Sequence, residues 1–332
     1  MRLLLALTAG VALATAQTPR FLNAQLQTLA ANGNLSAQWQ QAKSAAGPLW
    51  LGYSVPRVAS NHNDGGCGVS YLETGDRDSG GEHVAALESP RQLYVLYRLS
   101  HGDVDKIRTF SEYCELDAGG LPVRWLTGVS TEQSVALLES LVPQTPVQNG
   151  GIAAIALTDG AAADAALDRM LGPGQAETLR KRVVFWLGAA RGHAGFMELQ
   201  KVARGDASIA VRTQTAFGLN VSADPGAVEE LIRMAKTDAA PKVREQALFW
   251  LSQKAGKKAA ATLGSAVSDD PDTAVKERAV FGLSQLPNHD GVPMLIQVAE
   301  TNPNPAVRKK AIFWLGQSHD PRALDFFEKI LQ

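Results

Sequence analysis

The sequence has few cysteines, few histidines and almost no net charge. Of its 332 residues only two are cysteine and six are histidine, and 32 basic residues stand against 33 acidic ones. A net charge of −1 gives no global attraction to nucleic acid or to an anionic membrane, so we expect neither as a partner. The histidines are scattered and form no i, i+4 pair, so we predict no metal and no other cofactor.

Motifs that carry catalysis are also missing. The sequence contains no GxSxG elbow, no phosphate-binding P-loop and no GxGxxG after a strand. Cys67 lies between glycines and would be the one imaginable nucleophile, and the polar run 61–64 (Asn-His-Asn-Asp) would be the one imaginable metal loop. A disulfide and an ordinary surface loop explain these two features better. We therefore predict no catalytic residue and a protein that is not an enzyme.

Long hydrophobic runs are absent as well. After the first residues, no segment reaches the roughly 18 apolar residues that a membrane-spanning helix needs. Residues 1–16 begin with Arg2, continue as an apolar stretch and end in Ala-Thr-Ala, which is typical of a cleaved secretory signal. A buried N-terminal helix is the alternative. We predict export, to the periplasm or the medium, without membrane insertion.

The two cysteines, Cys67 and Cys114, favour one bridge if the protein is exported. Closing a loop of this length would add roughly 3–4 kcal/mol of stability in the chain-entropy model. Two buried free thiols are the alternative. Without neighbouring histidine ligands, the pair does not indicate a zinc site.

What the sequence has in abundance is repetition. Phenylalanine recurs at a step of 32 residues through the C-terminal half, leucine follows two residues later, and an aliphatic residue followed by a base precedes it by six. A period of 20–50 residues is typical of solenoids, whose units bury their apolar faces only against each other. The aliphatic–base pairs are Leu179-Arg180, Val211-Arg212, Val243-Arg244, Val275-Lys276 and Val307-Arg308.

Each repeat is expected to contain two helices. The first carries apolar residues at spacings of three and six, which places them on one helical face, and the second begins at the aliphatic–base pair. Between the two helices stands a polar residue that also keeps the 32-residue step. These residues are Asp206, Asp238, Asp270 and Asn302.

This pattern resembles HEAT repeats, especially the short phycobilisome-lyase-like variety. In that family an acidic residue in the turn is followed by Val-Arg, small apolar residues and Leu-Gly. Here the run 238–244 supplies the acid and Val-Arg, and Ala247, Leu248 and Leu251 follow. The resemblance covers about residues 130–332 and implies a curved scaffold that binds proteins or peptides. We expect the acids and bases to brace the turns, with a basic stripe that meets ligand as the alternative.

The residue after each phenylalanine alternates between tryptophan and glycine, and glutamine follows three residues later in the last three repeats. In the HEAT arrangement these side chains would lie on the concave side of the array. They would then form apolar pockets along a groove, or else pack as core between units. The candidate partner-binding residues are Phe185, Trp186, Phe217, Phe249, Trp250, Gln253, Phe281, Gln285, Phe313, Trp314 and Gln317.

The region before the repeats is different in character. Residues 17–47 favour helix, with a break at Asn32-Gly33-Asn34, and residues 48–128 favour a small antiparallel β domain. Within it, segments 49–55, 91–99, 106–115 and 121–126 are rich in β-branched and aromatic residues. We therefore predict a mainly α fold, with a HEAT-like α-solenoid over 129–332 and this small β element before it.

The function that follows from this architecture is an exported, non-catalytic scaffold that presents a curved surface to a protein or peptide. Two alternatives stay open. The resemblance to phycobilin lyases implies a tetrapyrrole lyase or chaperone, although a secretion signal argues against it. A hydrolase-like N-terminal region guided by the solenoid would depend on Cys67 and His62.

Overall fold

The computed structural model describes residues 18–59, 68–74 and 90–331, and its contacts divide the chain into two compact units. The sheet unit contains the described residues up to 154, and the repeat unit contains residues 155–331. The sequence suggested a boundary after residue 128. Helix α2 (Thr131–Leu141), however, contacts α1 (Leu35–Lys43) and strand β3 (Leu49–Pro56), so the contacts group it with the sheet unit.

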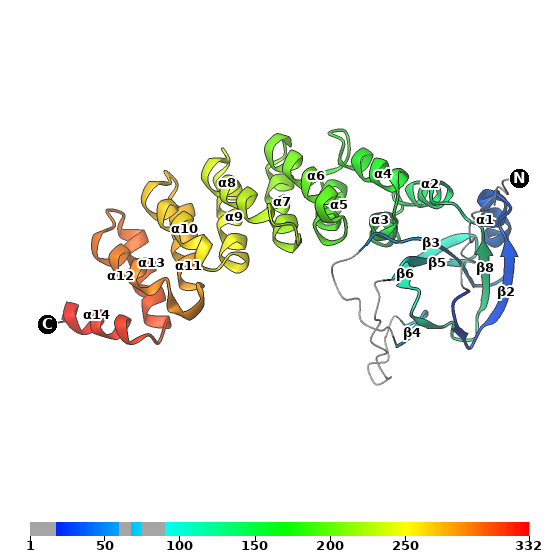
Figure 1. The fold of residues 1–332 in the computed structure, drawn as a ribbon, viewed down its shortest axis with the longest axis horizontal. Helices are drawn as coiled ribbons and strands as arrows, with labels where there is room; N and C mark the ends of the chain where they lie inside the picture. Colours follow the sequence, from blue (N-terminus) through cyan, green and yellow to red (C-terminus); the bar gives the residue numbers. More distant parts are fainter. Residues whose placement is uncertain (1–17, 60–67, 75–89, 332) are drawn as a thin grey trace, which may run out of the picture. The chain divides into compact units, whose positions relative to one another are not determined.

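The sheet unit contains two sheets (Figure 1). In the larger one, of order β2-β8-β3-β5-β6, strand β8 runs parallel to both of its neighbours, and β3, β5 and β6 form an antiparallel meander. The smaller sheet, of order β1-β7-β4, is parallel. The remaining strands are β1 (Phe21–Leu22), β2 (Gln25–Ala30), β4 (Val69–Tyr71), β5 (Gln92–Ser100), β6 (Asp103–Ser111), β7 (Glu115–Asp117) and β8 (Pro122–Thr127).

Both faces of the larger sheet are covered, because β3 and β5 are buried along nearly their whole length. On one face Trp39 of α1 stacks edge-on against Tyr97, and Tyr53 shares a hydrogen bond of 2.9 Å with Ser134 of α2. On the other face Trp50 and Trp125 pack in a cluster that includes residues of the smaller sheet. Aromatic rings therefore fill the core of this unit.

Most of the β expectations are confirmed, and two are corrected. The strand at 49–55, the hairpin across His101-Gly102-Asp103 and the strand at 121–126 are all present. Residues 21–30 form strands, although helix was expected there, because β2 pairs along all six residues with β8, nearly a hundred positions later. For the same reason the sheet is mixed and not purely antiparallel.

The repeat unit consists of helix pairs, which confirms the mainly α fold with stacked repeats. First helices are α4 (Ala161–Leu171), α6 (Gly192–Gly205), α8 (Ala227–Thr237), α10 (Lys257–Asp269), α12 (Val292–Thr301) and α14 (Pro321–Leu331). Second helices are α5 (Glu177–Ala190), α7 (Ile209–Val221), α9 (Pro241–Lys254), α11 (Thr273–Ser284) and α13 (Pro305–Gln317). Helix α3 (Gln148–Leu157) crosses the division between the units, and the 3₁₀ helix η1 (Pro287–His289) precedes α12.

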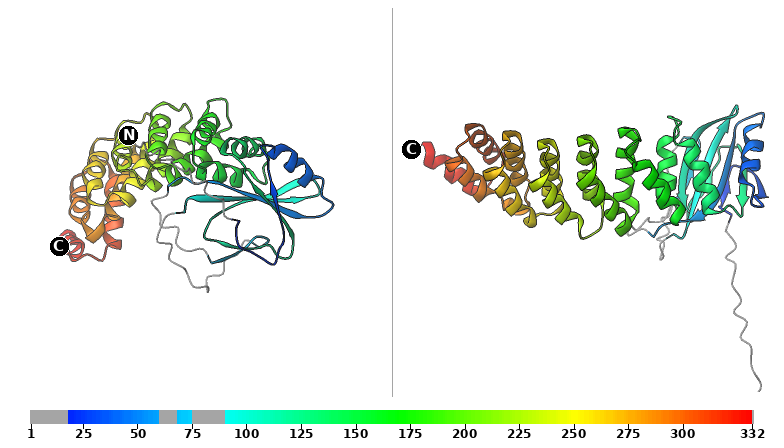
Figure 2. Two further views of the ribbon diagram at one scale, coloured as in Figure 1. Left: turned by 45° about the vertical axis from the view of Figure 1, so that its right-hand side comes forward. Right: turned by 90° about the horizontal axis from the view of Figure 1, so that it is seen from above.

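Within this unit the pairs stack in one row (Figure 2), and the second helices lie on the inner side of the curve (Figure 1). Consecutive second helices contact one another more extensively than consecutive first helices do, as an inner position requires. The core between pairs is aliphatic. The second helices contribute Val211, Val243, Val275 and Val307 together with Leu219, Leu251, Leu283 and Leu315, all of them at most 1% exposed.

Candidate binding surface

The recurring aromatic residues form one continuous strip along the second helices. Phe185 stacks on Phe217 with ring centroids 5.8 Å apart, and Phe249 stacks on Phe281 at 6.1 Å. Tryptophans join these pairs, because Trp250 lies 4.8 Å from Phe217 and 4.7 Å from Phe249. We call this set the aromatic strip: Phe185, Trp186, Phe217, Phe249, Trp250, Phe281, Phe313 and Trp314.

The alternation of tryptophan and glycine has a steric reason. A Cβ on Gly218 would lie 2.9 Å from the carbonyl oxygen of Val184, and one on Gly282 would lie 2.5 Å from a methyl carbon of the buried Leu263. A larger residue at 218 would require the backbone to shift, and one at 282 would require the Leu263 side chain to move. The next tryptophan in the chain packs instead on the preceding phenylalanine, as Trp314 does on Phe281 at 5.1 Å. The aromatic pattern thus repeats every two units, which is 64 residues.

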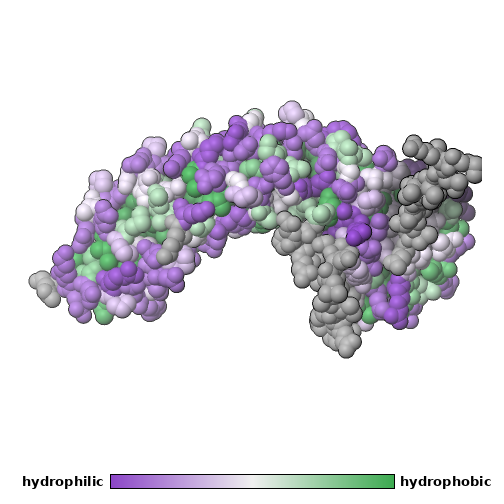
Figure 3. Space-filling view, in the orientation of Figure 1, coloured by the Kyte–Doolittle hydropathy of each residue, from purple (hydrophilic) through white to green (hydrophobic). Residues whose placement is uncertain are grey.

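The phenylalanines lie at the surface and not in the core. Four of them are half-buried, and Phe313 is 53% exposed. The tryptophans are also half-buried, but the indole N–H groups of Trp250 and Trp314 are buried and, within the described residues, have no acceptor. Leaving such a group unpaired costs about 1–3 kcal/mol, and these two rings are held by their contacts with the neighbouring phenylalanines. In the space-filling view, hydrophobic residues of the repeat unit appear as separate areas among hydrophilic ones (Figure 3).

Glutamines border the strip. Gln253, Gln285 and Gln317 are exposed, and each follows a phenylalanine by four residues, so each shares that ring's helix face. The amide of Gln285 donates to Ser284 at 3.1 Å, and neither of the other two has a side-chain hydrogen bond to any described residue. Their amides remain accessible beside the rings.

Behind the strip, the turns are connected by a ladder of arginine and aspartate. Arg212 donates two hydrogen bonds, of 2.9 and 3.1 Å, to Asp238 of the next repeat, and Arg244 donates two, of 2.7 and 2.9 Å, to Asp270. Arg180 donates one hydrogen bond to Asp206 through Nη1, while its buried Nε has no acceptor among the described residues. Each base therefore joins its own repeat to the following one, across 26 residues.

The same arginines also close the turns of their own repeats. Nη1 of Arg244 donates to the carbonyl of Asp238 at 2.8 Å, while the carboxylate of Asp238 accepts from the backbone N–H of Ala240 at 2.9 Å. Burial raises the pKa of Asp238, but the hydrogen bonds from Arg212 and Ala240 outweigh it, so this pKa lies below its ordinary value. Each aspartate braces its turn in two ways. Its carboxylate accepts a hydrogen bond from the backbone N–H two residues later, and it pairs with the arginine of the preceding repeat.

The ladder is interrupted once. By the 26-residue step, Lys276 should meet Asn302, but Lys276 donates instead to the carbonyl of Ser268 at 2.8 Å. The amide of Asn302 donates to the carbonyl of Val267 at 3.4 Å, and Arg308 still donates to the carbonyl of Asn302 at 2.8 Å. At this junction Lys276 and Asn302 stand where the other repeats have an arginine and an aspartate. The turn itself is still held by the hydrogen bond from Arg308.

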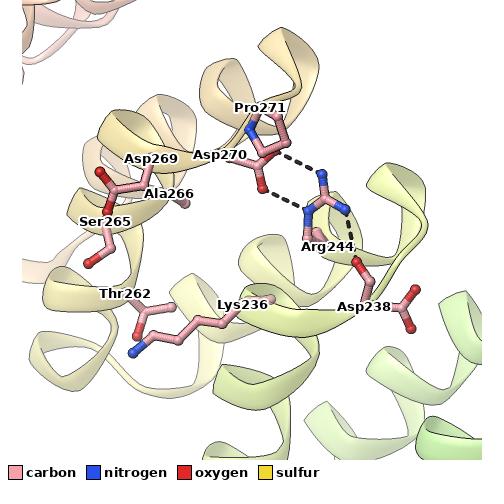
Figure 4. A pocket seen from close by; sticks show the side chains of 10 residues that line it. Lys236, Asp238, Arg244, Thr262, Ser265, Ala266, Asp269, Asp270 and Pro271 are labelled. Carbon is pink, nitrogen blue, oxygen red and sulfur yellow. Dashed lines mark hydrogen bonds and ion pairs between the residues drawn. The ribbon is translucent and has the colours of Figure 1, made fainter.

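A pocket of 540 Å³ lies beside this ladder, between α8, α9 and α10. In Figure 4, Arg244 stands in its wall between Asp238 and Asp270, with Lys236 and Thr262 on the opposite side. The charged groups of Arg244 and Asp270 satisfy each other, and two further charged residues of the lining, Lys236 and Asp269, are exposed and of opposite sign.

Other sequence candidates lie elsewhere. Cys114 is buried in the sheet unit, 3.5 Å from the hydroxyl of Ser111. Cys67, the run 61–64 and the proposed signal 1–16 fall outside the described residues, so the disulfide and the signal stay predictions. Over the described ranges, no group of three or more metal-ligating side chains comes together. No described helix has both the length and the apolar character needed to span a membrane.

Sequence reasoning missed the side chains that precede the strip. Arg278 places its guanidinium carbon 5.6 Å from the ring centroid of Phe249 and 5.7 Å from that of Phe281. The signal was available, because the same 32-residue column holds Arg182, Gln214, Gln246 and Lys310. This column is less regular than the aliphatic–base pairs, because it mixes bases and glutamines.

A family model supports the repeat architecture over the C-terminal part of the chain. The family model of HEAT repeats matches residues 196–283 and 260–332, and no curated protein matches the sequence. The complex of CpcE and CpcF of phycocyanin lyase from Nostoc sp. PCC7120 is a similar solved structure, at 24% identity and a TM-score of 0.36, over 46% of this chain and 98% of that one. Human deoxyhypusine hydroxylase is another similar solved structure, at 18% identity and a TM-score of 0.32, over 60% of this chain and 90% of that one. Residues 196–332 of this chain thus match the HEAT-repeat family.

Proposed function

We propose that this protein is an exported, non-catalytic scaffold whose repeat unit binds an extended peptide segment of a protein partner along the aromatic strip. The observation that carries the proposal is that a continuous series of rings stays partly exposed along the second helices, above a buried core of valine and leucine. Side chains kept at a fixed step but left at the surface are what a binding surface requires.

The flanking groups suit a peptide. An extended chain presents backbone carbonyl and N–H groups at a regular spacing, and the exposed amides of Gln253, Gln285 and Gln317 can both donate and accept hydrogen bonds. Ring faces on the second helices supply apolar contact for alternate side chains. The partner's backbone would then be held by the amides and its side chains by the rings.

The test is a selection of random linear peptides on the full chain. Enriched peptides are then measured by fluorescence anisotropy against a Phe217→Ala/Phe249→Ala variant, which we expect to bind them at least about tenfold more weakly. Met197→Ala is the matched control, because Met197 is an exposed apolar residue on a first helix, α6. Equal binding by the native chain and the double variant would contradict the proposal, and so would an equal loss in the control.

Export and the alternatives have separate tests. Mass spectrometry of the protein from the envelope or medium should find a chain beginning at Gln17 if the predicted signal is cleaved. A visible absorption band on adding a bilin would favour the tetrapyrrole alternative instead. The hydrolase alternative depends on Cys67 and His62, which lie outside the described residues, and no described feature favours it.

A further inference from the structure

We infer that the partner segment is acidic, with carboxylates that pair with bases along the aromatic strip; this inference rests on the proposed function. It starts from the column of side chains three residues before each phenylalanine, which we call the donor column. Residues at i and i+3 share a helix face, so each member lies beside its ring. The donor column consists of Arg182, Gln214, Gln246, Arg278 and Lys310, all half-buried.

Every member of the donor column carries N–H donors, and none is an acid. Among the described residues, no carboxylate forms an ion pair with Arg182, Arg278 or Lys310. This contrasts with the ladder behind the strip, where Arg212 and Arg244 are matched to aspartates. The unmatched bases therefore face outward on the binding side, while the matched ones hold the repeats together.

The central base is held in place for this role. Arg278 lies over the rings of both Phe249 and Phe281, a cation–π arrangement that fixes the guanidinium at the middle of the strip without using its hydrogen-bond donors. A guanidinium held in this way can form a two-point contact with a carboxylate. An incoming acidic side chain would complete it.

The adjacent column favours the same sign of charge. One residue before the donor column stand Lys181, Thr213, Glu245, Glu277 and Lys309. Together the two columns hold five bases and two acids, whereas the whole chain holds 32 bases and 33 acids. One of the two acids, Glu245, is already paired with Lys242 at 3.6 Å. The strip is thus a local basic region on a nearly neutral protein.

A peptide fits this charge distribution better than a nucleic acid or a lipid surface does. A nucleic acid carries a phosphate at every nucleotide. Some of these phosphates would lie against Glu245 and Glu277 in the middle of the strip, where like charges repel. A flat membrane cannot contact helices on the inner side of a curve (Figure 1). A peptide can carry carboxylates opposite the bases and apolar side chains opposite the rings.

The test compares two short labelled peptides that share leucine and glycine positions but carry glutamates in one case and lysines in the other. With the full chain, we expect the glutamate peptide to bind at least about tenfold more tightly, and its affinity to fall with added salt. Arg278→Glu should weaken it by about tenfold or more, while Arg278→Lys, which keeps the charge but loses the two-point contact, should weaken it less than Arg278→Glu does. Lys236→Glu is the control, since Lys236 is an exposed base on the first helix α8.

The outcomes separate the two proposals. If both peptides bind equally and both lose binding in Phe217→Ala/Phe249→Ala, the charge inference fails while the binding strip stands. If the glutamate peptide does not bind, if Lys236→Glu weakens it as much as Arg278→Glu, or if single-stranded DNA or anionic vesicles displace it, the inference is overturned. Thermal unfolding of each variant checks that the repeats remain folded.

Discussion

The cores of the two units are built from different residue types. In the sheet unit, Trp50, Tyr53, Tyr97 and Trp125 are fully buried, and aromatic rings fill both sides of the sheet. In the repeat unit, valine, leucine and alanine fill the core, and the aromatic strip stays half-exposed. The repeat unit also buries charge, as paired arginine and aspartate, while the sheet unit buries hydroxyls, with Tyr53 and Tyr97 sharing a hydrogen bond of 2.5 Å.

The difference shows that aromatic residues form the core of one unit and a partly exposed surface in the other. A sheet covered on both faces leaves wide spaces between layers, which large rings fill. Stacked helix pairs approach closely, as at Gly218 and Gly282, and aliphatic side chains complete their core. Rings that recur at 32 residues do contact their neighbours in the next pair, but they stay partly exposed, so their recurrence also calls for an explanation at the surface.

The largest expected effect tests aromatic burial. Trp125→Ala should destabilise the protein by about 3–5 kcal/mol, because it opens a cavity in a core where Trp125 is 0% exposed. Phe313→Ala, at a ring that is 53% exposed, should cost about 1 kcal/mol or less. Urea unfolding measures both. Similar losses for the two variants would contradict the contrast between the units.

The next effect concerns the buried ion pairs. Arg244→Ala leaves Asp270 buried without its partner and should cost about 3–5 kcal/mol. Lys276→Ala, at the equivalent position in the next repeat, removes only a hydrogen bond to a carbonyl and should cost about 0.5–1.5 kcal/mol. Equal losses in urea unfolding would show that the arginine ladder adds nothing beyond local turn bracing.

Asp238 in the repeat unit and Tyr53 in the sheet unit should make stability depend on pH in opposite directions. The pKa of Asp238 is lowered in the fold, so its stabilisation is complete above the unfolded value of about 4 and is lost as pH falls through the folded one. Burial raises the pKa of Tyr53 to about 12, so stability there is lost as pH rises above the unfolded value of about 10. Asp238→Asn should flatten the acid side of the stability profile only, and Tyr53→Phe the alkaline side only, as measured by unfolding between pH 3 and pH 11 in steps of about one unit.

The smallest effect comes from restoring the missing pair. Lys276→Arg with Asn302→Asp recreates the arrangement of Arg244 and Asp270, and the double variant should be more stable than the sum of the single changes by about 0.5–3 kcal/mol. Asn302→Asp alone should destabilise, because it places an unpaired charge at a position that is 8% exposed. A double-mutant cycle measures the coupling. Additive effects would mean that this junction differs in geometry from the others.

Much of the repeat unit was readable from the sequence, and less of the sheet unit. The 32-residue step located every second helix from α5 to α13, because each repeat makes its contacts with near neighbours in the chain. Strand β2 was mistaken for helix, because its partner β8 is nearly a hundred residues away and the local residues are compatible with helix. For the candidate site, the sequence identified the aromatic residues but left open whether they are core or surface.

The sequence by itself determined the period, the helix pairs, the aliphatic core columns and the residues of the ladder, because these depend on spacing along one chain. Only the tertiary structure decided that Arg180, Arg212 and Arg244 each pair with the aspartate 26 residues ahead. It also decided that Trp250 bridges Phe217 and Phe249, and that Arg278 lies over two rings without an ion-pair partner among the described residues. Exposure and pairing depend on how closely neighbouring helices approach. That distance is set by packing between repeats, and no single repeat encodes it.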